Sequence, residues 1–557
     1  MKVRLRRKRE RDPVRHVPSF SRIYLEQTLL PEVMVLKRRK SFLINTAVLT
    51  GASLAMRTVS LAFQVFLSEQ MGAAGLGLLQ LILTVSMFAA TFAISGVRFA
   101  STRLISEELG RGNDAGVLRA VRSCLLYALC FGVAAALLLR SGAPLIGARL
   151  VGDARSVPAL RLLSLSLPFL AMSAVFSGYF TAAGKIGRSA AVQVAEQLIR
   201  TGTAVLLLSG NAPVDAERAC TLVVAGNVIG EIVSFLLLAG LYAADRRRLP
   251  QCDKKTKRHF AGRLLRIALP LAWTAYARTA ISTVQNLLVP RGFRKSGASA
   301  EQALADYGLI QGMVFPVLLF PTALFGALSE LVVPELTRAQ VRGDAQGIER
   351  RAAEVLRLCM LLSVGAVGLL LAYSDALGET LYHSGSAGRY MRLLAALMPI
   401  MFLDTVTDGM LRGLGEQLAV MRYNILDSAV STVLIWFLLP RYALEGYVFV
   451  LYFSELFNFT LSVRRLSRVA RLRLPFLDTG MAAAAAAGAV STAQLSLRWL
   501  RLPLCASVWS LLLHAVVSGC LYFLFLRLLG VVRKNDSVFQ RFRLRLGESH
   551  RFFRGGC

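Results

Sequence analysis

Apolar residues in this chain fall into runs of about 20, the length of helix that matches the hydrocarbon core of a bilayer. Short charged segments separate the runs. Fourteen such runs predict an all-α polytopic membrane protein. The predicted spans cover residues 42–66, 74–97, 119–140, 157–183, 190–209, 218–243, 263–288, 306–333, 355–374, 390–411, 420–440, 443–463, 480–498 and 504–530.

Glycine, proline and charged residues recur at a constant spacing along the chain. An offset of 231 pairs Gly77 with Gly308, Pro168 with Pro399, Gly178 with Gly409, Glu196 with Asp427, and Arg111–Asn113 with Arg342–Asp344. In the first span of each half the offset is 221, which pairs Arg57 with Arg278 and Gln64 with Gln285. A repeat of six spans, an even number, predicts two parallel six-helix repeats followed by two C-terminal helices.

This repeat predicts the domain organisation. The predicted parts are a basic N-terminal segment at 1–41, a first lobe at 42–243, a basic linker at 244–262, a second lobe at 263–466, two helices at 480–530 and a basic tail at 531–557. Within the first segment, Met34 is a candidate for the true start, because it opens a compact basic stretch just before the first span.

The net charge of +32 is concentrated in these basic segments. Lys and Arg are enriched on the cytoplasmic side of membrane proteins, so we expect both termini and the linker in the cytoplasm of a bacterial cell. Four arginines in predicted outer loops depart from the pattern: Arg149, Arg155, Arg291 and Arg294. The basic segments therefore indicate anionic membrane lipids as partners and not nucleic acid.

The first span of each half carries a polar stripe with an arginine at its centre. Side chains three or four residues apart share one face of a helix. The stripes contain Ser53, Arg57, Ser60 and Gln64 in the first half, and Thr274, Arg278, Ser282 and Gln285 in the second. A mid-span arginine is costly in lipid, so such a stripe faces protein or a watery cavity. Two interpretations remain open: the arginines bind an anionic substrate through their planar fork, or they pair with a carboxylate such as Glu196 or Asp427.

Other ionisable residues inside spans are candidates for coupling or gating. Glu196 and Arg200 stand at positions i and i+4, where they can neutralise each other. Asp404 and Asp408 have the same spacing and indicate a proton or cation site, a gate, or a cap that faces a loop. Glu231 and Glu455 are single acids for which the sequence shows no partner.

Four stretches carry a family resemblance: MGAAGLGLLQ (Met71–Gln80), VAEQLIRTG (Val194–Gly202), IALPLAWTAYARTAISTVQNLLVPR (Ile267–Arg291) and YGLIQGMVFPVLLFPTALFGALSELVVPEL (Tyr307–Leu336). They resemble the polysaccharide-exporter branch of the MATE-like flippase superfamily, which includes sporulation proteins and is related to lipid II flippases. The resemblance implies a flippase of lipid-linked oligosaccharide or peptidoglycan precursor that works by alternating access. Lipid II flippases have cavity arginines on their first helix, and Arg57 matches one of them. Phe63 stands where the second is expected.

Two competing functions, a cation exporter and a membrane enzyme, require residues that can be sought in the sequence. A MATE-type exporter of cationic drugs needs acids in its cavity, whereas the first span has none between Phe42 and Phe66. A membrane enzyme needs a carboxylate-bearing loop, and the connections here are short and contain no D-x-D. We therefore expect no enzymatic activity, and we expect neither a cofactor nor a metal site, because no cysteine or histidine pair has ligand spacing. A monomeric transporter remains the preferred interpretation, and a non-transporting scaffold remains an alternative.

Overall fold

The computed structural model describes residues 20–210, 215–246, 260–470, 477–499 and 507–531. The described residues fold into helices and short connections without a β-strand, which confirms the all-α prediction. The chain divides into two compact units, Met1–Ala55 and Met56–Cys557. In the first unit the helix begins at Phe20, well before the predicted span. Residues 1–19, 247–259 and 532–557, where much of the basic sequence lies, are outside the described residues, so the orientation stays a prediction.

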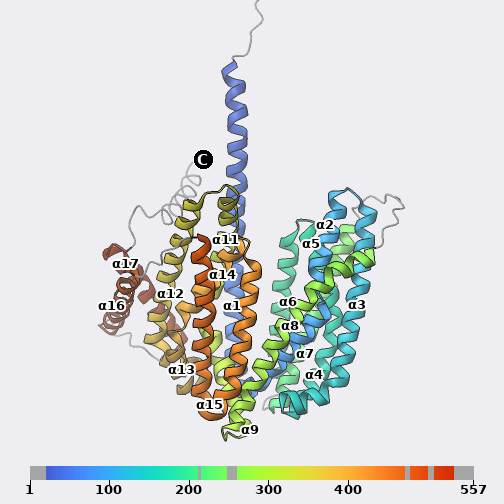
Figure 1. Ribbon diagram of the computed structural model, residues 1–557. Coiled ribbons are helices and arrows are strands. Elements are labelled where there is room, and N and C mark those ends of the chain that lie inside the picture. The colour runs from blue at the N-terminus through green and yellow to red at the C-terminus, as the bar shows by residue number, and fades with distance from the viewer. Residues whose placement is uncertain (1–19, 211–214, 247–259, 471–476, 500–506, 532–557) are drawn as a thin grey trace, which may run out of the picture. The chain divides into compact units, whose positions relative to one another are not determined.

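The helices follow the predicted order in both halves. Those of the first half are α1 (Phe20–Ile94), α2 (Val97–Gly110), α3 (Asp114–Leu145), η1 (Ile146–Val151), α4 (Val157–Leu163), α5 (Leu167–Ala182), α6 (Ile186–Ser209) and α7 (Ala216–Arg246). Those of the second half are α8 (Phe260–Lys295), α9 (Ala300–Gly308), η4 (Leu309–Val314), α10 (Phe315–Leu318), α11 (Thr322–Val341), α12 (Ala345–Tyr382), α13 (Gly385–Ala395), α14 (Met398–Gly413) and α15 (Gln417–Ala470). Helices α16 (Leu477–Trp499) and α17 (Val508–Leu528) pack on each other and on α12 (Figure 1).

Every predicted span coincides with a helix or a bent pair of helices, and two pairs of spans are joined. Spans 1 and 2 both lie in α1, which is interrupted at Gly72 with φ 65°. Spans 11 and 12 both lie in α15, which is interrupted at Ala443 with φ 46°. A positive φ at Gly72 is readily adopted, because glycine has no Cβ to clash with the backbone.

Length and hydropathy alone identify fewer spans among the described residues. Seven helical segments pass such a test, or nine if each bent pair is counted as one span. The joined spans explain part of the difference, and the charged or small residues of α6, α8 and α16 explain the rest. A bend of 54° separates α13 from α14, whose second residue is Pro399.

A symmetric contact between the halves supports the predicted repeat. A Cβ added at Gly77 would lie 2.0 Å from the carbonyl oxygen of Leu304, and a Cβ added at Gly308 would lie 2.0 Å from that of Ala73. Gly308 and Leu304 are the offset-231 counterparts of Gly77 and Ala73, so the two contacts are the same contact seen from each half. Only glycine permits so close an approach of two backbones, which is why both positions matter.

The two halves also begin their third spans in the same way. The Asn113 side chain accepts a hydrogen bond from the amide of Gly116 at the start of α3. Its counterpart, Asp344, accepts from the amide of Gly347 at the start of α12. Each caps its helix by satisfying an amide that has no partner within the helix.

Candidate functional site

Arg57 lies in α1 and reaches the second half of the chain. Its guanidinium donates to the carbonyl oxygen of Leu319, just after α10, at 3.4 Å. Its side chain is exposed, and among the described residues no carboxylate lies within ion-pair distance of it. The pairing of Arg57 with Glu196 or Asp427 is therefore absent from this conformation.

Arg278 lies in α8 at the matching position. Its side chain is also exposed, and it forms no ion pair with the part of the chain that the structure describes. The neighbouring residue, Thr279, is hydrogen-bonded through its hydroxyl to that of Thr91 in α1, at 3.4 Å. Thr91 is the counterpart of Thr322, whose hydroxyl donates to the same Leu319 oxygen that receives Arg57. Arg57 thus lies where α1 contacts the second half, and Arg278 lies where α8 contacts the first half.

The remaining stripe residues have different surroundings. Ser60 donates to a backbone carbonyl of its own helix and accepts from Gln197 of α6 at 3.3 Å. Gln64 is half-buried beside Gly312, and its amide nitrogen has no hydrogen-bond partner in the described parts of the chain. Ser53 is exposed in the first compact unit. In α8, Thr274 and Ser282 are exposed or partly exposed, and Gln285 is half-buried.

Carboxylates of the first half lie close to a cation. Glu196 of α6 accepts a hydrogen bond from the Ser234 hydroxyl of α7 at 2.8 Å. Glu231 lies near both Glu196 and Arg200, so it is not the isolated acid that the sequence indicated. The expected Glu196–Arg200 ion pair does not form at contact distance, and Arg200 instead donates to the Gln197 side chain. Two acids and one arginine nevertheless share this site.

Carboxylates of the second half are hydrogen-bonded to neutral side chains, and Asp408 also lies near the Arg412 guanidinium. Asp404 is buried in α14 and accepts from the Asn458 amide of α15 at 2.9 Å. Asp408, one turn later, accepts from the Ser462 hydroxyl at 3.0 Å. These contacts place both acids against α15, so the interpretation as a cap that faces a loop is wrong.

Two further acids join the same region of α15. Asp427, the counterpart of Glu196, accepts from the Ser454 hydroxyl at 2.8 Å. Glu455 lies near both Asp427 and Asp408. The other carboxylate oxygen of Asp404 and the amide oxygen of Asn458 are buried without a hydrogen-bond partner among the described residues. Unsatisfied buried oxygens at one place can bind a proton or a cation.

The sequence did not indicate the neutral partners of these acids. Asn458 and Ser462 lie 54 residues from the aspartates that they contact, and no motif marks them. One signal was available: Ser454, Asn458 and Ser462 recur at intervals of four, which places them on one face of α15.

Helix α8 contacts the first half along its length (Figure 1). Arg263 near its start forms ion pairs with Glu107 and the fully buried Glu108 of α2. In the middle, the Tyr276 hydroxyl donates to Ser95 at 2.7 Å. Near its end, Arg291 donates to the carbonyl of Leu150 at 2.8 Å. Helix α8 is therefore attached to the first half at both ends.

The arginines that departed from the expected charge pattern gather at this second attachment. Arg291 donates to the carbonyls of Arg149 and Leu150, and Arg294 donates to that of Gly152 at 3.1 Å. Asp153 accepts hydrogen bonds from Arg155. Burial raises the pKa of Asp153, but these bonds outweigh burial and hold its pKa below the usual range. The guanidinium groups of Arg155, Arg291 and Arg294 are thus engaged in local contacts.

Comparisons with known proteins agree with this architecture. The family described as polysaccharide biosynthesis protein matches residues 42–340. Stage V sporulation protein B of Bacillus subtilis (strain 168) is 23% identical over 408 residues, which cover 72% of this chain and 79% of that protein. Sporulation protein YkvU of the same organism is 20% identical over 359 residues, which cover 63% of this chain and 78% of its own length.

Solved transporters share the fold. An inward closed conformation of the lipid II flippase MurJ superposes with a TM-score of 0.65 at 14% identity, covering 86% of this chain and 98% of the flippase. An inward-facing multidrug resistance MATE family transporter gives 0.57 at 13% identity, covering 75% and 96%. These likenesses confirm the predicted multi-pass architecture of two helical repeats with two additional helices.

Proposed function

Because the chain belongs to the polysaccharide biosynthesis protein family, we propose that it is a flippase of lipid-linked, phosphate-bearing glycans. Its substrate class is a polyprenyl-pyrophosphate oligosaccharide or peptidoglycan precursor, moved across the bacterial plasma membrane by alternating access. The sporulation proteins and the lipid II flippase among its relatives support this class. Both termini lie in the cytoplasm in this proposal, and a single chain is the working unit.

One observation carries the proposal: Arg57 and Arg278 occupy matching positions, and neither pairs with a carboxylate in the described chain. A structural arginine in a membrane is paired with an acid, because an uncompensated charge is costly there. An arginine held for an anionic ligand stays unpaired until the ligand arrives. The two guanidinium groups then bind a pyrophosphate from the two halves, and each provides parallel N–H donors.

Polar neighbours of the arginines complete the proposed binding surface. Ser60 and Gln64 contribute from one half, and Thr274, Ser282 and Gln285 contribute from the other. Gln64 has a buried amide nitrogen without a partner in the described residues, which is a donor available to an oxygen-rich ligand. These side chains contribute hydrogen bonds, and the arginines contribute charge. A role for Ser53 in this binding surface is predicted only from its place in the polar stripe of the sequence.

The coupling site in this proposal is the acid cluster of the second half, made of Asp404, Asp408, Asp427 and Glu455. The buried Asp404 oxygen that has no hydrogen-bond partner among the described residues is the place for a proton or a cation in this proposal. Glu196 and Arg200 belong to the site of the first half where an arginine partly compensates two acids, and we propose a gating role there.

A MATE-type exporter of cationic compounds is the second candidate, since the fold is shared with such transporters and the acid cluster offers negative charge. The two candidates differ in where the substrate binds. A cationic drug would bind at the acids, whereas a phosphate-bearing lipid would bind at the arginines.

Flipping by purified protein in liposomes tests the proposal. A fluorescent polyprenyl-pyrophosphate oligosaccharide serves as substrate, and the rates are normalised to folded protein. We expect Arg57→Ala and Arg278→Ala each to lower the rate at least tenfold, which corresponds to about 1.4 kcal/mol. The double variant should fall to background. Arg57→Lys keeps the charge but loses the fork, so it should retain partial activity.

Arg140→Ala is the matched control, because Arg140 is an exposed arginine of α3 outside the stripes. It should flip normally. If the arginines were structural, their loss would lower the amount of folded protein and leave the normalised rate intact. Wild-type flipping by the double variant would refute the proposal, and so would export of a cationic dye without lipid flipping.

A further inference from the structure

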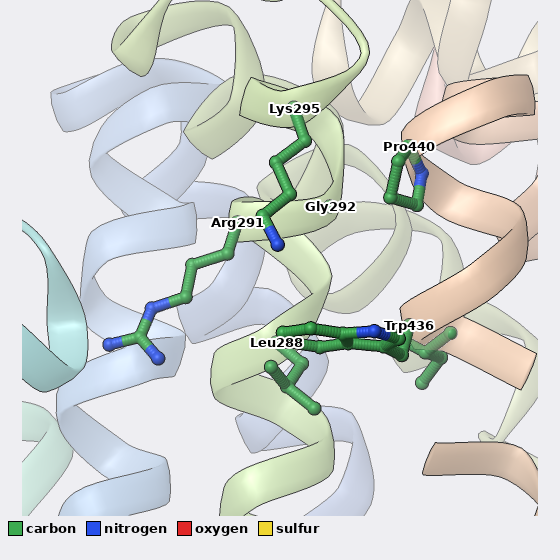
Figure 2. Close-up of a pocket in the computed structure, with 7 residues that line it drawn as sticks. Leu288, Arg291, Gly292, Lys295, Trp436 and Pro440 are labelled. Atoms are coloured by element: carbon green, nitrogen blue, oxygen red, sulfur yellow. The ribbon is translucent and has the colours of Figure 1, made fainter. Parts of the chain in front are cut away.

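A pocket of about 200 Å³ lies near the end of α8, away from the arginine stripes (Figure 2). Seven residues of α8 and α15 line it: Leu288, Arg291, Gly292, Lys295, Ile435, Trp436 and Pro440. The two helices meet here from positions 141 residues apart (436 minus 295). Basic, aromatic and aliphatic side chains therefore share one small cavity.

Lys295 supplies the charge of this pocket. Its ammonium nitrogen lies 4.0 Å from the centre of the Trp436 ring. Figure 2 shows the Arg291 guanidinium directed away from Trp436, in accord with its bonds to the carbonyls of the first half. None of the seven lining residues is acidic. Lys295 thus stands over an aromatic face without a carboxylate in the pocket, which leaves its hydrogen-bond donors available to an anion.

The predicted span 263–288 ends seven residues before Lys295, so we expect the pocket at the headgroup region of a bilayer. Helix α8 has 36 residues and is about 54 Å long at 1.5 Å per residue, which exceeds the hydrocarbon thickness. Lys295 is its last residue, so its ammonium reaches the polar layer. Leu288 lies seven residues earlier (295 minus 288), about 10 Å deeper along the helix. The pocket is therefore polar at the membrane surface and apolar below.

Residues around the pocket present an apolar surface. Trp436 is 53% exposed and Phe437 62% exposed, on a helix whose neighbouring turns bury other side chains against α8. Large exposed aromatic residues at a helix end are typical of the membrane interface. The opening therefore faces lipid, and a lipid is the ligand that can reach it.

The repeat provides an internal comparison. At offset 231 the counterparts of Trp436 and Pro440 are Val205 and Ser209. Lys295 falls in the ten residues by which the offset changes (231 minus 221), so it has no counterpart in the first half. The equivalent helices of the first half end without a basic–aromatic set, so packing of this helix pair does not require one.

We propose that this pocket binds the phosphate of an anionic membrane phospholipid. Lys295 pairs with the phosphodiester, the Trp436 ring packs along the glycerol, and Leu288 and Ile435 contact the first methylenes of an acyl chain. A volume of about 200 Å³ has room for a phosphodiester. The single basic side chain over an aromatic ring favours a membrane phospholipid over the transported lipid, which the proposed function places at the two arginines.

Arg291 connects the pocket to a contact between the two halves of the chain. Arg291 lines the pocket and also holds the carbonyls of Arg149 and Leu150. A bound headgroup fills the space beside Arg291 while that contact is made.

Native mass spectrometry of the detergent-purified full chain tests the proposal. The probes are phosphatidylglycerol and phosphatidylcholine with identical acyl chains. We expect wild-type protein to prefer phosphatidylglycerol, and we expect Lys295→Gln to lower its affinity about tenfold while phosphatidylcholine binding is unchanged. Trp436→Val, which installs the residue of the first half, should lower the affinity several-fold. Lys295→Arg should retain it, which separates lost charge from lost folding.

Arg389→Gln is the matched control, since Arg389 is an exposed arginine of α13 outside the pocket. It should bind phosphatidylglycerol as the wild type does. Wild-type affinity in Lys295→Gln would overturn the proposal. Displacement of phosphatidylglycerol by millimolar inorganic phosphate would reveal a small-anion site and also overturn it. Polyprenyl phosphate binding that exceeds phosphatidylglycerol binding and depends on Lys295 would assign the site to the transported lipid instead.

Discussion

The two halves of this chain share their helices but differ in how they hold buried acids. In the first half, Glu196 and Glu231 lie near Arg200. In the second half, Asp404 is contacted by the neutral amide of Asn458, and its charged neighbours Asp408, Asp427 and Glu455 are all acids. Negative charge near an arginine is partly neutralised in place, whereas negative charge among other acids requires a mobile cation or proton. We therefore propose that ion coupling belongs to the second half.

The largest effect concerns the symmetry on which this comparison depends. Gly77→Ala and Gly308→Ala should each place a methyl group against a backbone carbonyl of the other half and destabilise the fold by about 3 kcal/mol. Because the two contacts are equivalent, the two losses should be alike. Thermal unfolding in detergent measures both.

Gly202→Ala is the matched control, because Gly202 lies inside α6 with no atom within 4 Å of an added Cβ. It should stabilise the protein by up to about 1 kcal/mol. If Gly77→Ala unfolds the protein and Gly308→Ala is neutral, the halves are not related as the repeat requires.

The next effect concerns the uncompensated acids. Asp404→Asn keeps the size of the side chain and removes its charge, so we expect gradient-driven flipping to fall at least tenfold, with folding preserved. Flipping rates with and without an imposed sodium or proton gradient measure this. Asp375→Asn is the control, since Asp375 is an exposed acid of α12 that pairs with Arg392. A gradient response in Asp404→Asn equal to that of wild type would remove the coupling role from this cluster.

The smallest effect concerns the acids of the first half that lie near Arg200. Arg200→Gln leaves Glu196 and Glu231 without a cation, so it should lower flipping several-fold. The double variant Glu196→Gln/Arg200→Gln removes one charge of each sign and should remain within about twofold of wild type. A double-mutant cycle on flipping rates measures the interaction. Additive losses would mean that Arg200 does not balance these acids.

Much of this fold could be predicted from the sequence. The apolar runs located all fourteen spans, and glycines and prolines at constant offsets identified the repeat. The turns at Gly72 and Ala443 that join two pairs of spans into α1 and α15 were not foreseen. The non-helical backbone torsion angles at Gly72 and Ala443 show that each pair is two helices that meet at a kink without an intervening loop.

The candidate sites were predictable only in part. Periodicity alone identified the stripe residues around Arg57 and Arg278, because neighbours on one helix face are fixed by spacing. The partners of Asp404 and Asp408 lie on another helix, and so does that of Lys295. Contacts between helices depend on how the helices pack, and hydropathy carries no information on that packing.

In the proposed mechanism, Arg57 and Arg278 together bind the phosphates of a lipid-linked glycan. A structure of the wild-type protein with a bound polyprenyl-pyrophosphate oligosaccharide is the decisive experiment. We expect the pyrophosphate oxygens within hydrogen-bond distance of both guanidinium groups, with one arginine contributed by each half. A pyrophosphate bound elsewhere in the protein, with both arginines free of it, would contradict the claim.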